Sequence, residues 1–241
     1  MDKQILIFAH RGANSFAPEN SLQAFEEALR INCDGIEMDL RYTASGDIVV
    51  FHDRNLRRMT GYSGYIHQLS LENIRKCFLN GNAKYIIPTF EEVLELIQDK
   101  VIINIEIKRE FTRSNGFEEK VVKILKKFKL HDNIIISSYN PLVLKKIALI
   151  SPHLHLGFIY RNRSQKLMAI GTLLKSLHIN FRTLSKRYLK TMQEKGYKIF
   201  PWTVDQINDM KRLVEMGVDG IITNRPEVFF EMVQNNISVN I

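Results

Sequence analysis

The sequence predicts a (β/α)8 TIM barrel. Eight strand-like segments alternate with helical patterns over 241 residues, as in a parallel sheet whose strands are connected by helices. The polar residues that could take part in a reaction gather where several of these strands end, which is where such barrels place their active sites. A doubly wound sheet shows a similar alternation and is the alternative fold. The expected strands cover residues 4–10, 35–41, 101–108, 133–138, 154–160, 178–183, 198–204 and 219–223.

The first strand ends in a histidine and an arginine. In ILIFAHRG, Leu6, Phe8 and His10 share one face, and Arg11 follows directly. The next helical pattern places Leu22, Phe25 and Leu29 on one side. We interpret Asn20 as the N-cap of this helix and Gln23 as its N3 partner, a structural role.

Two further strands carry charges in alternation with apolar residues. Glu37 and Asp39 alternate with apolar residues in GIEMDLR, and Glu106 and Lys108 do so in INIEIK. Because successive strand side chains point to opposite faces, the acids of each run share a face. A buried carboxylate is costly unless it is paired or holds a metal ion. The three acids therefore predict a functional site.

The segment after residue 41 interrupts the alternation. TASGD leaves too few residues for a parallel crossover before IVVFHD, so we expect an antiparallel hairpin with Ser45 and Gly46 as its turn. This register places His52 opposite Asp39, on the same face, and leaves Asp53 as a turn or orienting residue. Residues 54–87, with a helical stretch near 70–78, are interpreted as an insertion over the barrel mouth.

The remaining elements complete the barrel. The residues with the spacing of one helical face are Phe90, Val93, Leu94 and Ile97 in one helix, and Phe229, Met232 and Val233 in another. Trp202 lies in the strand IFPWTV, where a core position is the usual role of a tryptophan. The whole chain, 1–241, is expected to form one barrel domain.

Composition limits the class of protein. A hydrophobic content of 45% suffices for a large core, and no apolar stretch is long enough for a transmembrane helix or a signal peptide. Two cysteines without metal-type pairing favour a reducing, cytoplasmic location. The net charge of +8 favours anionic substrates or phospholipid headgroups. Nucleic acid is not expected, because dense basic blocks with interleaved aromatics are absent. The oligomeric state is left open.

The polar residues suit phosphoryl transfer. Glu37, Asp39 and Glu106 offer hard oxygen ligands, which favour Mg²⁺, Ca²⁺ or Mn²⁺ over structural Zn²⁺. Cationic side chains nearby would bind an anionic group, which applies to Arg11 and Lys108. Two histidines, His10 and His52, could exchange protons near neutral pH.

The motifs HRGANSFAPEN, GIEMDLRYTASGDIVVFHD, IPTFEEVLEL, INIEIK, SSYNP, WTVD and DGIITNRPE occur in this order over nearly the whole chain. They resemble the motifs of the glycerophosphodiester phosphodiesterase family. The resemblance implies a (β/α)8 barrel that hydrolyses glycerophosphodiesters to an alcohol and sn-glycerol 3-phosphate with a divalent metal. It implies metal ligands at Glu37, Asp39 and Glu106, an acid/base pair at His10 and His52, and substrate contacts from Arg11, Lys108 and Trp202.

Other readings stay open at this point. One is a lysophospholipase D-type enzyme at a membrane surface, for which Tyr62 and Tyr65 of the insertion offer apolar contacts. Another is a non-catalytic barrel that binds phosphorylated metabolites. We take His10 as the acid and His52 as the base, an assignment that the sequence does not decide. Direct attack by water and a cyclic phosphate intermediate are both compatible with the residues.

Overall fold

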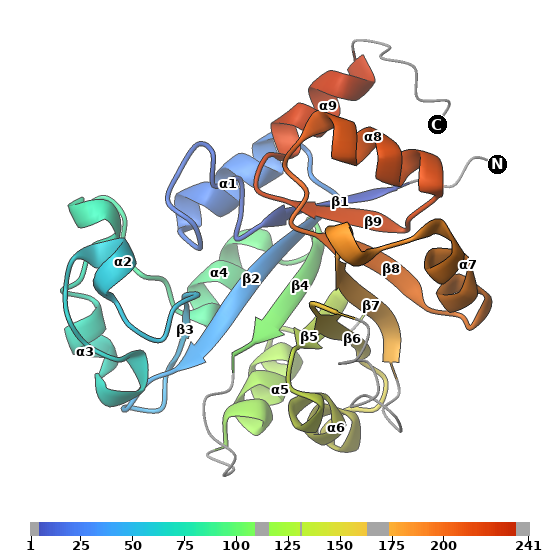
Figure 1. The fold of residues 1–241 in the computed structure, drawn as a ribbon. Coiled ribbons are helices and arrows are strands. Elements are labelled where there is room, and N and C mark those ends of the chain that lie inside the picture. Colours follow the sequence, from blue (N-terminus) through green and yellow to red (C-terminus); the bar gives the residue numbers. More distant parts are fainter. Residues whose placement is uncertain (1–4, 109–115, 131, 163–173, 235–241) are drawn as a thin grey trace.

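The computed structural model describes residues 5–108, 116–130, 132–162 and 174–234, and it confirms the barrel (Figure 1). Eight parallel strands follow one another in the order β8-β7-β6-β5-β4-β2-β1-β9, and β3 pairs only with β2. The amide of Val204 donates to the carbonyl of Ile222 at 3.0 Å, and Asp219 donates to Ile199 at 3.1 Å. These bonds bring β8 against β9 and nearly close the sheet.

Strands and helices alternate along the chain as expected. The strands are β1 (Leu6–His10), β2 (Gly35–Tyr42), β3 (Ile48–Val50), β4 (Ile102–Ile107), β5 (Ile134–Ser138), β6 (His155–Tyr160), β7 (Leu174–Asn180), β8 (Lys198–Trp202) and β9 (Gly220–Thr223). The helices around them are α1 (Leu22–Arg30), α4 (Phe90–Ile97), α5 (Phe117–Lys127), α6 (Pro141–Ile150), α7 (Lys186–Glu194), α8 (Ile207–Met216) and α9 (Pro226–Gln234). Residue 4 of the first predicted strand lies outside the described residues.

Two apolar layers position the site. Ile36, Met38 and Leu40 of β2 are buried in the large cluster between the strands and the surrounding helices, which includes the predicted face of α4. A smaller cluster inside the barrel contains Phe8 and Phe200. These aromatic rings fill the barrel interior further from the carboxyl-terminal ends of the strands. The polar residues of β2 and β4 therefore occupy the carboxyl-terminal end of the interior.

The bounds predicted for the sixth barrel strand were wrong, although they overlap the observed strand. The segment 178–183 was expected, but β7 spans Leu174–Asn180 and a 3-10 turn, η4 (Phe181–Thr183), follows. The side chain of Asn180 accepts a hydrogen bond from the amide of Arg182 at 3.0 Å and ends the strand. Ser176 and His178 are buried on this strand, so its apolar alternation is weak in the sequence.

The hairpin exists, but its predicted register is shifted by one residue. Leu40 pairs with Val50, and the amide of Phe51 donates to the carbonyl of Asp39 at 2.9 Å, so Phe51 rather than His52 lies opposite Asp39. The loop is closed by Thr43, whose amide donates to Asp47 at 2.9 Å. Gly46 has a φ of +84° within it, so the loop has three residues instead of two.

The predicted cap of α1 was also wrong. Ser21 is the N-cap, and its side chain accepts a hydrogen bond from the amide of Ala24. Asn20 has a left-handed backbone with a φ of 59° and is buried, which directs it toward the barrel. Its side chain bonds to Asp39 and is described with the site below.

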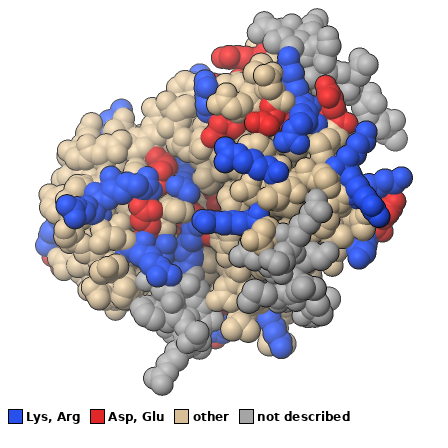
Figure 2. All heavy atoms as spheres, viewed as in Figure 1, with Lys and Arg blue, Asp and Glu red and all other residues tan. Residues whose placement is uncertain are grey.

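Residues 54–87 pack around a second apolar cluster beside the β2–β3 hairpin (Figure 1). They contain α2 (Arg57–Thr60), η1 (Ile66–Gln68), α3 (Leu71–Ile74) and η2 (Leu79–Gly81), so the helix expected near 70–78 is a single turn. Figure 2 shows Lys and Arg side chains gathered on the face shared by this segment and the barrel. Among the described residues, none of the helices is long and apolar enough to cross a membrane.

Candidate active site

A pocket of about 260 Å³ opens at the carboxyl-terminal ends of the barrel strands. Most of the polar residues singled out in the sequence line it. The lining comprises His10, Arg11, Glu37, His52, Asn104, Glu106, Lys108, Tyr139, Ile159, Arg161, His178, Trp202, Thr203 and Ile222. Asp39 lies beneath this surface, fully buried, in contact with two of the cations.

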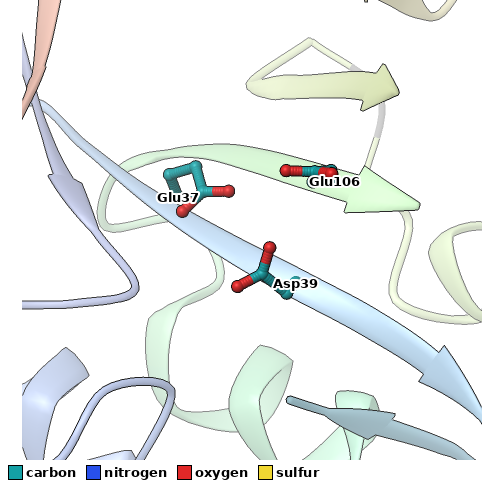
Figure 3. Close-up of side chains that lie close together, drawn as sticks. All are labelled: Glu37, Asp39 and Glu106. Atoms are coloured by element: carbon teal, nitrogen blue, oxygen red, sulfur yellow. The ribbon is translucent and has the colours of Figure 1, made fainter. Parts of the chain in front are cut away.

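The three acids converge on one point (Figure 3). One ligand oxygen from each of Glu37, Asp39 and Glu106 lies within 4.8 Å of the other two. The parallel register explains this, because Asp39 pairs directly with Glu106 across β2 and β4, and Glu37 lies two residues earlier on the same face. All three are buried, with 3%, 0% and 7% of their surface exposed.

Burial and mutual repulsion act strongly on these carboxyls. Burial, with the nearby charges of Asp39 and Glu106, raises the pKa of Glu37 well above its usual range. Burial also raises the pKa of Glu106. Burial opposes ionisation of Asp39 too, but Lys108 and Arg11 outweigh it and hold the pKa of Asp39 far below its usual range. Three crowded oxygen donors of this kind fit a hard divalent cation, which would relieve the repulsion.

Two cations flank the acids. Lys108 Nζ lies 2.6 Å from Glu106 Oε1 and 3.1 Å from Asp39 Oδ1. Arg11 Nε lies 3.2 Å from Asp39 Oδ2, and the Arg11 amide donates to Glu37 Oε2 at 3.1 Å. Both cationic side chains line the pocket, so an anionic ligand could contact them without moving the acids.

His10 is held by an amide. Its Nδ1 lies 2.7 Å from Asn224 Oδ1, while Asn224 Nδ2 donates to Asp205 Oδ2 at 2.8 Å. Because this bond turns the Asn224 oxygen toward His10, the imidazole must donate from Nδ1 and keep its lone pair on Nε2. Nε2 points toward Glu37 Oε2 at 3.9 Å. Burial, followed by the charge of Arg11, lowers the pKa of His10 to about 4.

His52 is held by a carboxylate. Its Nδ1 lies 2.7 Å from Asp53 Oδ1, and Asp53 Oδ2 accepts from Arg58 Nε at 2.6 Å. Asp53 therefore has the orienting position expected from the sequence. Burial lowers the pKa of His52, but Asp39 and the hydrogen bond to Asp53 oppose that effect. The two histidines thus differ in the charge of their partners.

Aromatic side chains form one wall of the pocket. Trp202 lies at the end of β8, and its ring meets the edge of Tyr139 with 5.9 Å between centroids. Lys108 Nζ lies 6.0 Å from the centroid of the Tyr139 ring, so this wall adjoins one of the two cations. The lining position agrees with the substrate contact implied for Trp202, which remains a prediction.

Sequence reasoning missed three side chains that support the site. Asn20 Nδ2 donates to Asp39 Oδ2 at 2.9 Å, so it positions a candidate metal ligand instead of capping a helix. Asn224 and Asp205 orient His10. Asn20 belongs to the PEN motif, Asn224 to TNRP and Asp205 to WTVD. These motifs are the signal in the sequence that could have identified the three residues.

The fold and the site together define a (β/α)8 barrel enzyme with an acidic, cation-flanked pocket suited to an anionic substrate. Comparison with known proteins narrows this class. Residues 10–228 match the glycerophosphoryl diester phosphodiesterase family, and the chain belongs to that family. It is a phosphoric diester hydrolase of the glycerophosphodiester phosphodiesterase type.

Individual members of the family are similar to this chain over nearly its whole length. A glycerophosphodiester phosphodiesterase of Caldanaerobacter subterraneus subsp. tengcongensis is 37% identical over 239 residues, covering 95% of this chain and 98% of the relative. The crystal structure of a Thermotoga maritima glycerophosphodiester phosphodiesterase has 27% identity and a TM-score of 0.79, with 96% and 100% coverage. An Oleispira antarctica phosphodiesterase in complex with the product sn-glycerol-3-phosphate has 23% identity and a TM-score of 0.85, with 95% and 96% coverage.

Proposed function

We propose that the enzyme uses a divalent metal and two histidines to hydrolyse glycerophosphodiesters to an alcohol and sn-glycerol 3-phosphate. The observation that carries the proposal is the convergence of three buried carboxylates, two cations and two oriented histidines on one pocket. The Oleispira antarctica neighbour, which shares the fold, was solved with sn-glycerol-3-phosphate, and this supports a substrate of the same chemistry.

Glu37, Asp39 and Glu106 would hold the metal, which would supply positive charge to the phosphate oxygens when bound. The donor set is compatible with Mg²⁺, Ca²⁺ or Mn²⁺. Arg11 and Lys108 would bind the remaining phosphate oxygens and stabilise the charge that develops on them. Trp202 would pack against the glycerol moiety.

The surroundings of the histidines favour His10 as the base and His52 as the acid, the reverse of our working assignment from the sequence. Burial, with Arg11 and Lys108, lowers the pKa of both histidines, so the contrast lies in the hydrogen-bond partners. The partner of His10 is the neutral amide of Asn224, and the pKa of His10 is lowered to about 4, which favours the uncharged imidazole that a base requires. The partner of His52 is the carboxylate of Asp53, which opposes the effect of burial and favours the imidazolium that an acid requires.

The proposed step moves one proton to each reacting oxygen. His10 Nε2 accepts the proton of the attacking hydroxyl as its oxygen forms a bond to phosphorus. The bond from phosphorus to the alcohol oxygen breaks, and His52 Nε2 donates its proton to that oxygen. The attacking hydroxyl is either water or the free glycerol hydroxyl, and the latter gives a cyclic phosphate that water then opens with the histidine roles reversed.

The same proposal covers domain organisation and location. The chain would act as one barrel domain, 1–241, with residues 54–87 as an insertion at the mouth, because Arg58 of this segment reaches Glu19 beyond β1 at 2.6 Å.

Cys33 and Cys77 are both buried free thiols, which supports the reducing, cytoplasmic location expected from the sequence.

The test is to incubate glycerophosphocholine with the purified enzyme and Mg²⁺ and to follow the reaction by ³¹P NMR. We expect the phosphodiester signal to be replaced by that of glycerol 3-phosphate, with choline released. Formation of phosphocholine and glycerol instead would contradict the proposed bond cleavage. Turnover of lysophosphatidylcholine in preference to all glycerophosphodiesters would favour the lysophospholipase D-type alternative.

A further inference from the structure

One side chain of the proposed insertion contacts the carboxylates behind two parts of the site. Arg58, on the single-turn helix α2, donates from Nε to Asp53 Oδ2 at 2.6 Å. Its terminal nitrogens donate to Glu19, with Nη2 2.6 Å from Oε1 and Nη1 3.1 Å from Oε2. The guanidinium therefore uses all three of its nitrogens on two carboxylates, one in the segment after β3 and one in the segment after β1.

Each of these carboxylates also holds a residue of the proposed mechanism. Asp53 Oδ1 lies 2.7 Å from His52 Nδ1. Glu19 Oε1 accepts a hydrogen bond from Arg11 Nη1 at 2.9 Å. A displacement of Arg58 would therefore reach both the proposed acid and one of the two cations proposed to bind phosphate.

The backbone around Arg58 is held by the second apolar cluster. Leu56 and Met59 are buried in this cluster, with 0% and 8% of their surface exposed. The hydroxyl of Thr60 donates to the carbonyl of Leu56 at 3.0 Å and closes the turn. These contacts fix the backbone on both sides of Arg58 and leave its side chain directed toward the barrel.

The two carboxyls around Arg58 are held in the charged form. Burial opposes ionisation of Asp53 and Glu19, but hydrogen bonds from Arg58 outweigh it and lower the pKa of both carboxyls. The guanidinium itself stays protonated in proteins. The three groups therefore form a charge-assisted network, whose hydrogen bonds are shorter and stronger than those between neutral groups.

We propose that Arg58 is a positioning residue of the reaction, which aligns the acid His52 through one carboxylate and the cation Arg11 through the other. The inference rests on the proposed function and deepens it, because it gives the insertion a part in catalysis besides covering the mouth. A planar guanidinium fixes the orientation of the carboxylates that it binds, which the point charge of a lysine does not do.

The test compares two glycerophosphodiesters that differ in the leaving group, glycerophosphoglycerol and the p-nitrophenyl ester of glycerol 3-phosphate. Departure of glycerol requires a proton from His52, whereas departure of p-nitrophenolate does not. In Arg58→Gln we expect kcat/KM to fall by about tenfold or more for glycerophosphoglycerol and by about threefold for the p-nitrophenyl ester. In Glu19→Gln, which acts through Arg11, it should fall by about threefold for both. Equal losses for the two substrates in Arg58→Gln, or no loss, would overturn the proposal.

A double-mutant cycle separates alignment of His52 from simple docking of the insertion. In the Asp53→Asn background, Arg58→Gln should change the ratio of the two kcat/KM values by less than about twofold, because the path to His52 is already broken. An undiminished effect of Arg58→Gln in that background would overturn the proposal.

Two further variants control for charge and for folding. Arg57→Gln, on the same helical turn, is the matched control, because Arg57 is exposed and its side chain has no ion-pair partner among the described residues. It should leave the ratio unchanged, and an equal change in this variant would overturn the proposal. Arg58→Lys keeps the charge but bonds one carboxylate at a time, so it should keep the native Tm and still lower the ratio by about threefold. A native ratio in Arg58→Lys would assign Arg58 to docking alone and overturn the proposal.

Failure of the proposed function would look different, because the native enzyme would then turn over neither substrate with any divalent metal. The downfield ¹H NMR signal of His52 Nδ1–H, assigned by its loss in His52→Gln, would then decide on the alignment alone. Its loss through faster exchange with water in Arg58→Gln but not in Arg57→Gln would support the positioning role. An unchanged signal in Arg58→Gln, or an equal loss in both variants, would overturn it.

Discussion

An exchange of the amide and the carboxylate behind His10 should move the pH profile of the enzyme. In the native chain, Asp205 accepts from Asn224 Nδ2 at 2.8 Å, and Asn224 Oδ1 lies 2.7 Å from His10 Nδ1. The double variant Asp205→Asn/Asn224→Asp keeps a donor and an acceptor at each contact. It places the carboxylate directly against the imidazole, so the imidazolium form of His10 gains an ion pair.

The size of the effect follows from that contact. An opposite charge within hydrogen-bond distance raises a histidine pKa by about one to three units. The native pKa of His10 is lowered to about 4 by burial and Arg11, so the double variant should titrate between about 5 and 7. As a base, His10 must be neutral, and activity is lost as the pH falls through its pKa. The acid limb of kcat/KM should therefore move upward by at least about one unit.

The assay is kcat/KM for glycerophosphoglycerol between pH 4 and pH 8 at saturating metal. Asn224→Ala serves as a control, because it removes the acceptor without adding charge; we expect a loss of about tenfold to 100-fold without an upward shift of the acid limb. An unchanged acid limb in an active double variant would refute the role of Asn224. An upward shift of the alkaline limb alone would show that His10 acts as the acid.

Three further predictions concern single side chains. Glu37→Gln should weaken metal activation by about tenfold or more without lowering the thermal stability of the metal-free protein, because it removes a repelled carboxylate; a large loss of Tm would indicate a structural role. His52→Ala should lower kcat by about 10²–10⁴-fold for an alcohol leaving group but much less for p-nitrophenol, which needs no proton; equal losses would exclude His52 as the acid. His178 is buried with a pKa lowered to about 3, so below pH 6.5 the unfolded chain takes up a proton that the folded chain does not. Its share of stability is lost as the pH falls, by about 2 kcal/mol at pH 5, and urea unfolding of His178→Gln should lack this decline.

The sequence predicted those features that depend on short-range periodicity. Alternation in β2 and β4 placed Glu37, Asp39 and Glu106 on one buried face, and the structure brings them together. Helical spacing identified the buried side of α4. These patterns are reliable because each residue is fixed by its neighbours two to four positions away.

The features that depend on distant contacts could not be predicted from the residues. Asn20 resembles a helix cap, but its left-handed backbone and the neighbouring Ser21 turn it toward Asp39 in another strand. Asn224 is separated from His10 by 214 positions, so only the closed barrel brings them together. The hairpin loop contains Gly46 and is one residue longer than predicted, which shifts the register of the hairpin by one residue. The sequence does not decide between the two-residue and three-residue turns.

The most direct test of the account is the release of glycerol 3-phosphate from glycerophosphoglycerol by the purified enzyme, before and after treatment with EDTA. The account predicts release that EDTA abolishes and that added Mg²⁺, Ca²⁺ or Mn²⁺ restores, because the three acids would hold the ion against the phosphate. Undiminished release after complete removal of divalent metal would contradict the metal site and the mechanism built on it.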